Sequence, residues 1–215
     1  MSEQDKTAEN KILDAAKIVF LEKGFDGARM QEIADEAKIN KALLHYYFRS
    51  KDKLFDAIFK EAFEQFLPKI AEIMMTQQPL FEKLEKFIDS YITMLSNNPH
   101  LPSFVMHEIN RNPERIVNII KGSGIKPEFL EMAIQKEVKA GIIIPVKPIH
   151  LIVNIIAMCL FPFMARPIIQ GFIFDNSPEA YKKFLAERKK EVTSFIINSI
   201  RLRQTQPDNM NKQNK

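Results

Sequence analysis

The apolar residues of this 215-residue chain recur at spacings of three and four, and this pattern limits the possible folds more than any other feature. Such spacings place side chains on one face of an α-helix, whereas a half-buried strand needs alternating apolar and polar residues. No sustained alternation is present, and glycine occurs only six times. The sequence therefore predicts an all-α fold.

The first helix is expected over residues 8–23. Ile12, Ala16 and Phe20 share one helical face, and Gly24 follows the last of these periodic positions. Glycine is the usual residue just past a helix end, because it adopts the left-handed conformation without a steric penalty. This helix should open an N-terminal domain over residues 6–52.

Three more helices are predicted before residue 70. A short second helix should bury Ile33 and Ala37, a third should begin near Asn40, and a fourth should open at Ser50. Asparagine and serine are favoured N-cap residues, because their side-chain oxygens accept hydrogen bonds from free N–H groups of the first turn. The fourth helix is expected to bend or end at Pro68, since proline lacks an N–H group and clashes with the preceding turn.

Prolines punctuate the rest of the chain, which is typical of a series of medium-length helices. They stand at positions 79, 99, 102, 113, 127, 145, 148, 162, 167 and 178. The predicted helices cover residues 80–97, 101–110, 113–121, 127–140, 148–165 and 178–204. These helices would form a larger helical bundle domain over residues 53–204. A disordered tail is expected over residues 205–215, where no core-forming pattern occurs.

The distribution of charge allows an anionic partner. The chain carries a formal net charge of +4. Residues 1–60 are balanced, but Lys38–Lys53 holds four more basic than acidic side chains. Residues 181–215 are also basic, which is typical of a solvated helix face. That second basic stretch leaves an alternative function open, a helical interaction or membrane-surface module without specific DNA binding.

The sequence carries no motif for catalysis. None of the histidines at 45, 100, 107 and 150 pairs with another four residues away, and Lys121–Gly124 lacks the spacing of a phosphate-binding loop. No Gly-x-Ser-x-Gly elbow occurs. Cys159, the single cysteine, lies in an apolar run and is expected to be a small core residue. We therefore expect no enzyme, no cofactor, and no catalytic or metal-binding residue.

No segment predicts export or a membrane span. The first ten residues are polar and of mixed charge, unlike a signal peptide. The most apolar run, residues 149–165, is interrupted by His150, Asn154 and Pro162, and it is shorter than the roughly 20 residues that cross a bilayer. We expect a cytoplasmic protein with no membrane partner, in which this run is buried in the core or against a second subunit.

Residues 30–48 have the layout of a helix-turn-helix, two short helices joined by a tight turn. Leu44 and Phe48 of the second helix should point inward. Its other side chains are left to face outward or sideways: Lys41, Ala42, Leu43, His45, Tyr46 and Tyr47. Such a surface suits the major groove of DNA, where base edges and thymine methyl groups offer hydrogen bonds and apolar contacts.

Two lysines stand at positions where a helix dipole disfavours a cation. Lys41 follows Asn40 and Lys51 follows Ser50, so each lies in the first turn of a helix, at a cost of about 0.3–1 kcal/mol. A phosphate at such a helix N-terminus would offset this cost, because free amides and the lysine both attract it. We therefore expect both lysines to contact the DNA backbone.

The order of these motifs resembles the TetR family of bacterial regulators. The resemblance rests on Ile33 and Ala34, on the segment 40–48, and on the segment 50–55, and it covers roughly residues 8–60. It implies a repressor that binds a palindromic operator in double-stranded DNA as a homodimer and is released by a small hydrophobic effector. The remaining three quarters of the chain share the architecture of the family without its sequence.

Two positions depart from the family pattern. Ala28 and Arg29 replace the usual Thr or Ser cap before the second helix, which weakens that cap and leaves Arg29 as a candidate phosphate ligand. His45 replaces the usual tyrosine, whose phosphate contact is then in doubt because histidine has a different reach and a titrating charge. The full set of expected DNA-binding residues is Arg29, Gln31, Asn40, Lys41, Ala42, Leu43, His45, Tyr46, Tyr47 and Lys51.

A homodimer is expected because one helix-turn-helix reads too few base pairs. Two recognition helices about 34–36 Å apart fit successive major grooves. The last helix offers an apolar stripe as the interface, formed by Phe184, Val192, Phe195, Ile196 and Ile200. Together with the helix over residues 148–165 it would build a four-helix bundle between subunits. The alternative is that both helices serve only an intramolecular core.

An apolar effector pocket is expected among the middle helices, because ligand sites usually combine apolar walls with a few polar groups. The candidate lining residues are Tyr91, Met94, Phe104, His107, Arg111, Met132, His150, Asn154, Met158 and Phe161. Methionine and phenylalanine can adapt to varied hydrophobic compounds. The alternative is that these side chains are ordinary core, with His150 and Asn154 hydrogen-bonded across a dimer interface.

Overall fold

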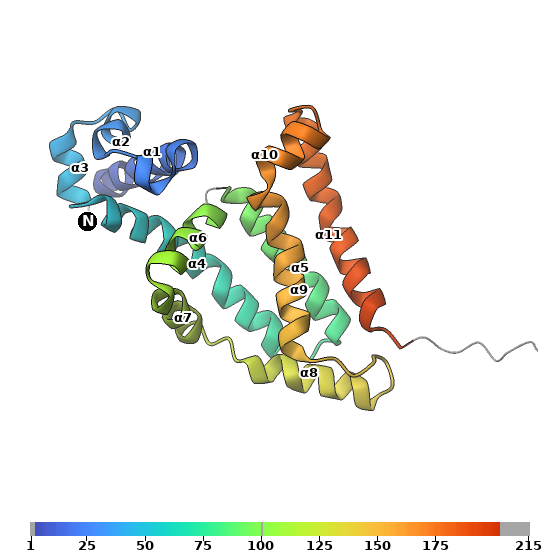
Figure 1. Cartoon of the computed structure of the whole chain (residues 1–215). Coiled ribbons are helices and arrows are strands. Elements are labelled where there is room, and N and C mark those ends of the chain that lie inside the picture. The colour runs from blue at the N-terminus through green and yellow to red at the C-terminus, as the bar shows by residue number, and fades with distance from the viewer. Residues whose placement is uncertain (1–2, 100, 203–215) are drawn as a thin grey trace, which may run out of the picture.

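The computed structural model describes residues 3–99 and 101–202, whose regular elements are helices (Figure 1). This confirms the predicted all-α fold. The expected disordered tail, residues 205–215, lies outside the described residues.

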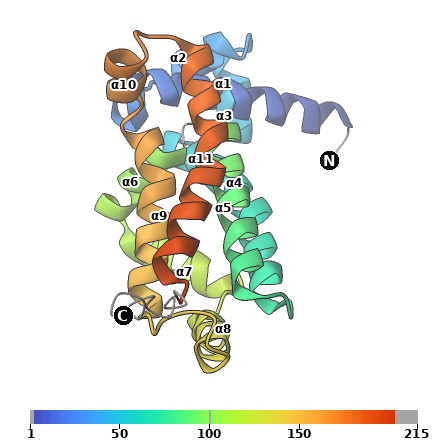
Figure 2. The same cartoon turned by 90° about the vertical axis from the view of Figure 1, so that its right-hand side faces the viewer.

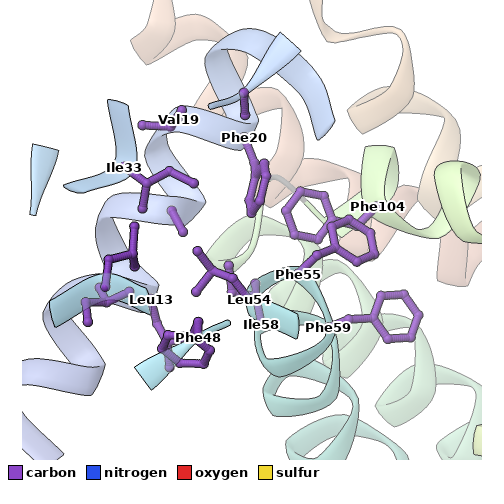
Figure 3. Packing of buried hydrophobic residues seen from close by; sticks show 14 of the residues in the cluster. Leu13, Val19, Phe20, Ile33, Phe48, Leu54, Phe55, Ile58, Phe59 and Phe104 are labelled. Carbon is purple, nitrogen blue, oxygen red and sulfur yellow. The ribbon is translucent and has the colours of Figure 1, made fainter. Parts of the chain in front are cut away.

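The first three helices form a small head at one end of the molecule (Figure 1). They are α1 (Glu3–Gly27), α2 (Met30–Glu36) and α3 (Lys41–Tyr47). Within α1, Gly24 has φ 69° and ψ 173°, so the regular helix is interrupted at the predicted stop before a last short turn. Their apolar faces meet around Ile12, Ile33 and Leu44, each fully buried. Figure 3 shows Ile33 among other side chains of this core. The spacing of the apolar residues thus sets how the head folds.

The fourth helix, α4 (Lys51–Met75), leads from the head into the larger part of the chain (Figure 1). We expected Pro68 to end or bend this helix. It does not end the helix, because α4 continues through Pro68 for seven more residues. Pro68 lies on the exposed side of α4, while its neighbours Leu67 and Ile70 are buried. Burial of these side chains offsets the backbone hydrogen bond that proline cannot make.

Seven further helical elements follow. They are α5 (Leu80–Asn97), α6 (Leu101–Arg111), α7 (Pro113–Gly122), α8 (Pro127–Lys139), α9 (Pro148–Met164), α10 (Arg166–Ile168) and α11 (Pro178–Ile200), with a π turn, η1 (Ile169–Ile173), after α10. Helices α9 and α11 lie side by side, and α11 also packs along α5 (Figures 1 and 2). Ile88, Ile155 and Val192 are fully buried where these three helices meet.

The short elements α10 and η1 were not predicted. The chain leaves them through Asp175 and Asn176, whose φ angles of 46° and 62° lie in the left-handed region that asparagine and aspartate tolerate. Ser177 then caps α11 by accepting a hydrogen bond from the Ala180 N–H at 3.2 Å. A sharp local reversal therefore joins the two long helices.

The apolar run that contains Cys159 lies in α9. Cys159 is 1% exposed, as expected of a core residue, and burial raises the pKa of its thiol to about 12. Across the described residues, no helix by itself is long and apolar enough to span a bilayer. Length and composition single out only the pair formed by α9 and residues 166–173, which is bent by 58°.

Candidate functional site

Helices α2 and α3 form the predicted helix-turn-helix, and its turn is fixed by backbone hydrogen bonds. The Ile39 N–H donates to the Ala34 carbonyl at 3.0 Å, and the Lys38 N–H donates to the Asp35 carbonyl at 3.1 Å. Lys38 has a φ of 56°, the left-handed conformation that this kind of helix end requires. These backbone hydrogen bonds therefore fix the angle between α2 and α3.

The predicted N-caps at Asn40 and Ser50 are confirmed. The Asn40 side-chain oxygen accepts a hydrogen bond from the Leu43 N–H at 2.7 Å, and the Ser50 hydroxyl accepts one from the Lys53 N–H at 3.2 Å. Each cap satisfies one of the free N–H groups at a helix start. Asn40, although expected to touch DNA, therefore already has a structural role at the start of α3.

The start of α2 is capped by a different residue from the one usual in the family. The Arg29 N–H donates to Glu32 Oε2 at 3.0 Å, and Lys23 Nζ pairs with Glu32 Oε1 at 2.8 Å. The Lys23 ammonium, followed by the Arg29 N–H, lowers the pKa of Glu32 below its usual value. Because Glu32 holds the backbone of Arg29, the exposed Arg29 side chain is left at the surface beside the start of α2.

The outer face of α3 is exposed in the pattern that a reading helix needs. Leu44 is fully buried and anchors α3 to the head, while Tyr46 is 76% exposed and Leu43 is 36% exposed. Tyr47 is half-buried against the core, and its ring stands edge-on to that of Tyr46 at 5.3 Å. The remaining predicted contacts on this side are exposed as well: Gln31, Lys41, Ala42 and His45. Gln31 Nε2 also donates to Asp35 Oδ1 at 2.8 Å.

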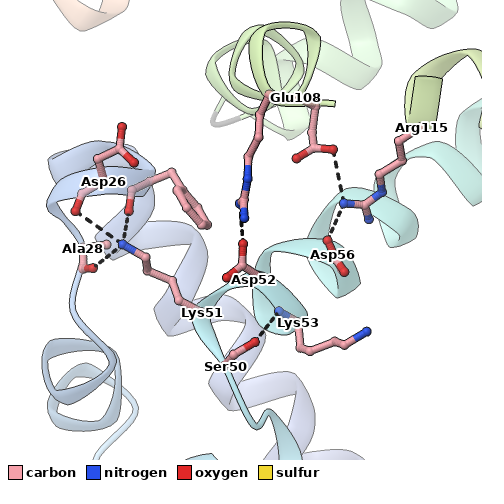
Figure 4. Close-up of polar contacts among 11 residues, drawn as sticks. Asp26, Ala28, Ser50, Lys51, Asp52, Lys53, Asp56, Glu108 and Arg115 are labelled. Carbon is pink, nitrogen blue, oxygen red and sulfur yellow. Dashed lines mark hydrogen bonds and ion pairs between the residues drawn. The ribbon is translucent and has the colours of Figure 1, made fainter. Parts of the chain in front are cut away.

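Lys51 differs from the expected free phosphate ligand. Its ammonium donates to three backbone carbonyls, those of Phe25 at 2.6 Å, Ala28 at 3.0 Å and Asp26 at 3.3 Å (Figure 4). It also lies 4.5 Å from the centre of the Phe25 ring. Free carbonyls at the end of α1 attract the cation, because a helix C-terminus carries partial negative charge. Lys51 therefore ties the end of α1 to the start of α4, and its three N–H bonds are already donated within the protein.

Replacing Lys51 with methionine should lower the free energy of unfolding by about 1.5–3 kcal/mol, the range for hydrogen bonds that involve a charged group. The dependence of DNA affinity on salt should not change, because this ammonium is held by carbonyls. Urea denaturation and DNA titrations at several salt concentrations would measure both effects, with exposed Lys53→Met as the matched control. Unchanged stability with a salt slope reduced by about one would instead assign Lys51 to the DNA backbone.

Two arginines, one on α6 and one on α7, form ion pairs with the first turns of α4. Arg111 pairs with Asp52, and Arg115 pairs with Asp56 and, at 3.3 Å, with Glu108 Oε2 (Figure 4). The Asp52 carboxylate raises the pKa of Arg111. Asp52 and Asp56 are one turn apart near the start of α4, so both ion pairs join that part of α4 to the segment 108–115.

Helix α6 also contributes apolar side chains to the core of the head. Phe104 is 2% exposed, and its ring lies 4.4 Å from that of Phe55 and 5.4 Å from that of Phe20 (Figure 3). His107 lies 4.4 Å from the Phe25 ring, and its Nε2 is buried without a hydrogen-bond partner among the described residues. The first hydrophobic core therefore extends beyond residue 52, where the sequence placed a domain boundary, to include α4 and α6.

An apolar cavity of about 620 Å³ lies among α4, α5, α6, α7, α8 and α9. Its polar lining side chains are Tyr91, Lys126 and Glu131. Tyr91 stacks on Phe66 at 5.5 Å, and burial raises the pKa of its phenol, so this group is neutral at physiological pH. The other lining residues include Phe63, Phe66, Leu67, Ile70, Met74, Leu84, Phe87, Met94, Leu95, Leu101, Pro102, Val105, Ile116, Ile120, Ile125, Leu130, Ile149, Ile152, Ile156 and Leu160.

Most of the residues expected to line this cavity lie elsewhere. Tyr91 and Met94 are in its wall. Phe104, His107 and Arg111 belong to the junction with the head, as described above. Met132 and Phe161 are 65% and 64% exposed outside the cavity.

His150, Asn154 and Met158 lie on a different face of α9. They border a groove between α9 and α11 together with Phe195. The inner face of α9 instead presents Ile152, Ile156 and Leu160 to the cavity. The expected polar set was therefore wrong for the cavity, because α9 is apolar around most of its circumference and its periodicity does not identify the inner face.

The predicted dimer stripe on α11 needs a similar correction. Val192, Ile196 and Ile200 are 0–3% exposed within one chain, in the core shared with α5 and α9. Side chains buried in this way cannot touch a second subunit. Phe184 is half-buried in a small cluster with Tyr181, and Phe195 is 62% exposed beside the groove. Phe195 thus remains the candidate interface residue on this helix.

Comparisons of the sequence with known proteins agree with this geometry. Residues 12–58 match the family described as bacterial regulatory proteins, tetR family. The probable HTH-type transcriptional regulator YttP of Bacillus subtilis (strain 168) is 23% identical over 195 residues, which is 88% of this chain and 94% of that protein. IcaR of Staphylococcus aureus (strain Newman), a negative regulator of the biofilm operon icaADBC, is 38% identical over 104 residues, which is 42% of this chain and 54% of IcaR.

Solved structures share the fold over most of this chain. HlyIIR, a hemolysin II transcriptional regulator, has 26% identity and a TM-score of 0.57, covering 93% of this chain and 99% of its own. AibR, solved with isovaleryl coenzyme A and operator DNA, has 21% identity and a TM-score of 0.61, covering 73% of this chain and 86% of its own, a likeness that shows the fold alone. Since the family match falls on the helix-turn-helix that the structure places at the surface, a module without specific DNA binding is not favoured. Residues 12–58 therefore form a helix-turn-helix domain of the kind found in the tetR family of bacterial regulatory proteins, and the chain is a DNA-binding transcriptional regulator.

Proposed function

We propose that this regulator is a cytoplasmic repressor that binds a palindromic operator as a homodimer and is released by a small apolar effector. One observation carries the proposal. Three residues separate the end of α3 from the start of α4, and the later turns of α4, from Phe63 to Met74, form one wall of the cavity. A ligand that displaces this wall would act on the same helix that follows the reading helix.

The connection between cavity and head is also made by α6. Leu101, Pro102 and Val105 line the cavity, while Phe104 packs into the core of the head. One short helix therefore borders the cavity and also packs against the DNA-binding part. IcaR, named as a negative regulator, and AibR, solved with both an acyl coenzyme A and operator DNA, supply the precedent for repression and for a small-molecule effector.

Release from DNA follows if the effector binds the DNA-incompetent arrangement more tightly. A preference of about 10⁴-fold would move the population from 1:99 to 99:1 between the two arrangements. The coupling is reciprocal, so the operator must weaken effector binding by the same factor. Repression and release would be tested by transcription in vitro from the operator, with and without the effector.

Leu43→Ala and Tyr46→Ala are expected to change the preference among operator variants by about 1–3 kcal/mol per affected base pair, because both side chains are exposed on the outer face of α3. Nonspecific affinity should hardly change, since neither side chain is charged. Selection of bound duplexes from a random pool would first supply the operator, and titration of its single-base variants would then measure the change.

Met75→Ala is a suitable control for these variants, because Met75 is 63% exposed at the far end of α4. It should leave both the preferred operator and the affinity unchanged. A uniform loss of affinity for all duplexes in Leu43→Ala and Tyr46→Ala would mean that these side chains support the head rather than read bases.

A further inference from the structure

We infer that the effector is a linear aliphatic chain with a single anionic head group, held with its chain in the cavity and its head beside Lys126. This inference rests on the proposed function, since it names the ligand of the same cavity. The argument uses the length of the cavity, the position of its polar groups and the charge at its edge.

The cavity is long relative to its volume. On α4 and α5 its lining residues begin and end eleven positions apart, at Phe63 and Met74 and at Leu84 and Leu95, and on α9 they begin and end twelve positions apart, at Pro148 and Leu160. Eleven residues of α-helix rise about 16 Å. A volume of about 620 Å³ spread over this length gives a mean cross-section of about 40 Å². This shape favours a chain lying lengthwise.

The interior offers a ligand almost no polar partner. Tyr91 is the polar residue among those that α4, α5 and α9 contribute to the wall, and its phenol is neutral. A ligand group that loses water there without gaining a hydrogen bond would cost affinity. The buried part of the ligand is therefore hydrocarbon, with no polar substituent along most of its length.

The charged lining residues lie at the edge of the cavity, on the segment that joins α7 to α8 and on α8 itself. Lys126 is exposed, and within residues 3–99 and 101–202 no carboxylate lies within ion-pair distance of its ammonium. Its Nζ lies 5.9 Å from the Phe129 ring. Glu131 already accepts a hydrogen bond from Gln135 Nε2 at 3.3 Å. An anionic head group beside Lys126 would form an ion pair with its ammonium and stay in contact with water.

Titration calorimetry with straight-chain carboxylates of increasing length tests whether the cavity holds an alkyl chain. Affinity should rise roughly fourfold per added methylene, the factor that corresponds to burial of one CH₂ group. The rise should level off once the chain exceeds about fourteen carbons, which span about 16 Å because an extended chain advances about 1.25 Å for each C–C bond of about 1.5 Å. Affinity that does not depend on chain length, or a rigid steroid acid that binds more tightly than dodecanoate, would overturn the proposal.

Lys126→Met tests the head group, with Lys121→Met as the matched control because Lys121 is exposed on α7 outside the cavity lining. Lys126→Met should weaken dodecanoate binding about two- to fivefold, as expected for a solvent-exposed ion pair. Dodecanol binding should stay the same in both variants. Dodecylammonium binding more tightly than dodecanoate in the wild type would show that Glu131 selects the head, and the assignment would be wrong.

Dodecanoate and dodecanoyl-coenzyme A carry the same alkyl chain, one as a free acid and the other as a thioester. The compound that binds with the higher affinity identifies the natural form of the ligand. Ile152→Trp, which fills the cavity from α9, should abolish binding of both while the thermal unfolding transition and operator binding persist.

Binding in calorimetry is measured separately from DNA release. Dodecanoate that binds without releasing operator would contradict the proposed switch and keep the ligand class. Release of operator by a different compound, with no binding of dodecanoate, would contradict the ligand class and keep the proposed switch.

Discussion

Replacement of Phe104 by alanine is expected to lower the free energy of unfolding by about 3–5 kcal/mol, the range for removing a buried phenylalanine. Phe104 is 2% exposed and stacks on Phe55 while meeting the edge of Phe20. The truncation would leave a void in a core to which α1, α4 and α6 all contribute. Urea denaturation followed by circular dichroism would measure the change.

A matched control for this variant is Phe172→Ala, since Phe172 is 85% exposed on η1. Its effect should stay within about 0.5 kcal/mol, as is usual for surface substitutions. The Phe104 variant should also weaken any coupling between effector and operator, because α6 borders both the cavity and the head. A loss of stability below about 1 kcal/mol would mean that α6 does not secure the head.

Phe195→Glu is expected to convert a dimer to monomers and to reduce operator affinity by about 10³-fold or more, down to the nonspecific level. Phe195 is 62% exposed beside the groove between α9 and α11, and Val153 of α9 is 54% exposed as well. A charge placed in an apolar contact between subunits would remain without a partner. Sedimentation and operator titrations would report both changes.

Two further substitutions make this result interpretable. Lys190→Glu changes the charge at an exposed position of α11 outside the groove and should leave the dimer intact. Ile196→Asp, by contrast, should unfold the chain, because Ile196 is 2% exposed in the core. A Phe195→Glu protein that remains dimeric would place the interface on another surface.

Local signals in the sequence were sufficient to predict the head. The apolar spacing that buries Ile33 and Leu44, and the caps at Asn40 and Ser50, depend on residues only a few positions apart. Because these features depend only on residues that are close in sequence, the helix-turn-helix could be predicted without knowledge of the rest of the fold. The continuation of α4 through Pro68 could not, because it depends on burial against distant helices.

The cavity and the interface were harder to predict, because they depend on which face of an apolar helix turns inward. On α9 both Ile152, which lines the cavity, and Val153, which is exposed, are equally apolar in sequence. The role of Lys51 was missed for a related reason. Its three carbonyl partners lie 23 to 26 positions earlier in the chain, and no nearby pattern indicates them.

The continuity of α4 has a consequence for protein engineering. A graft that joins this head to the sensor of another regulator has no flexible linker at which to cut, since α4 runs unbroken from Lys51 to Met75. A head cut at residue 60 would present Phe55 and Phe59 to water, because the cover that Phe104 gives to Phe55 comes from beyond the cut. A working chimera would therefore have to carry α6 along with the head, although 53 residues separate the end of α3 from the start of α6 in the sequence.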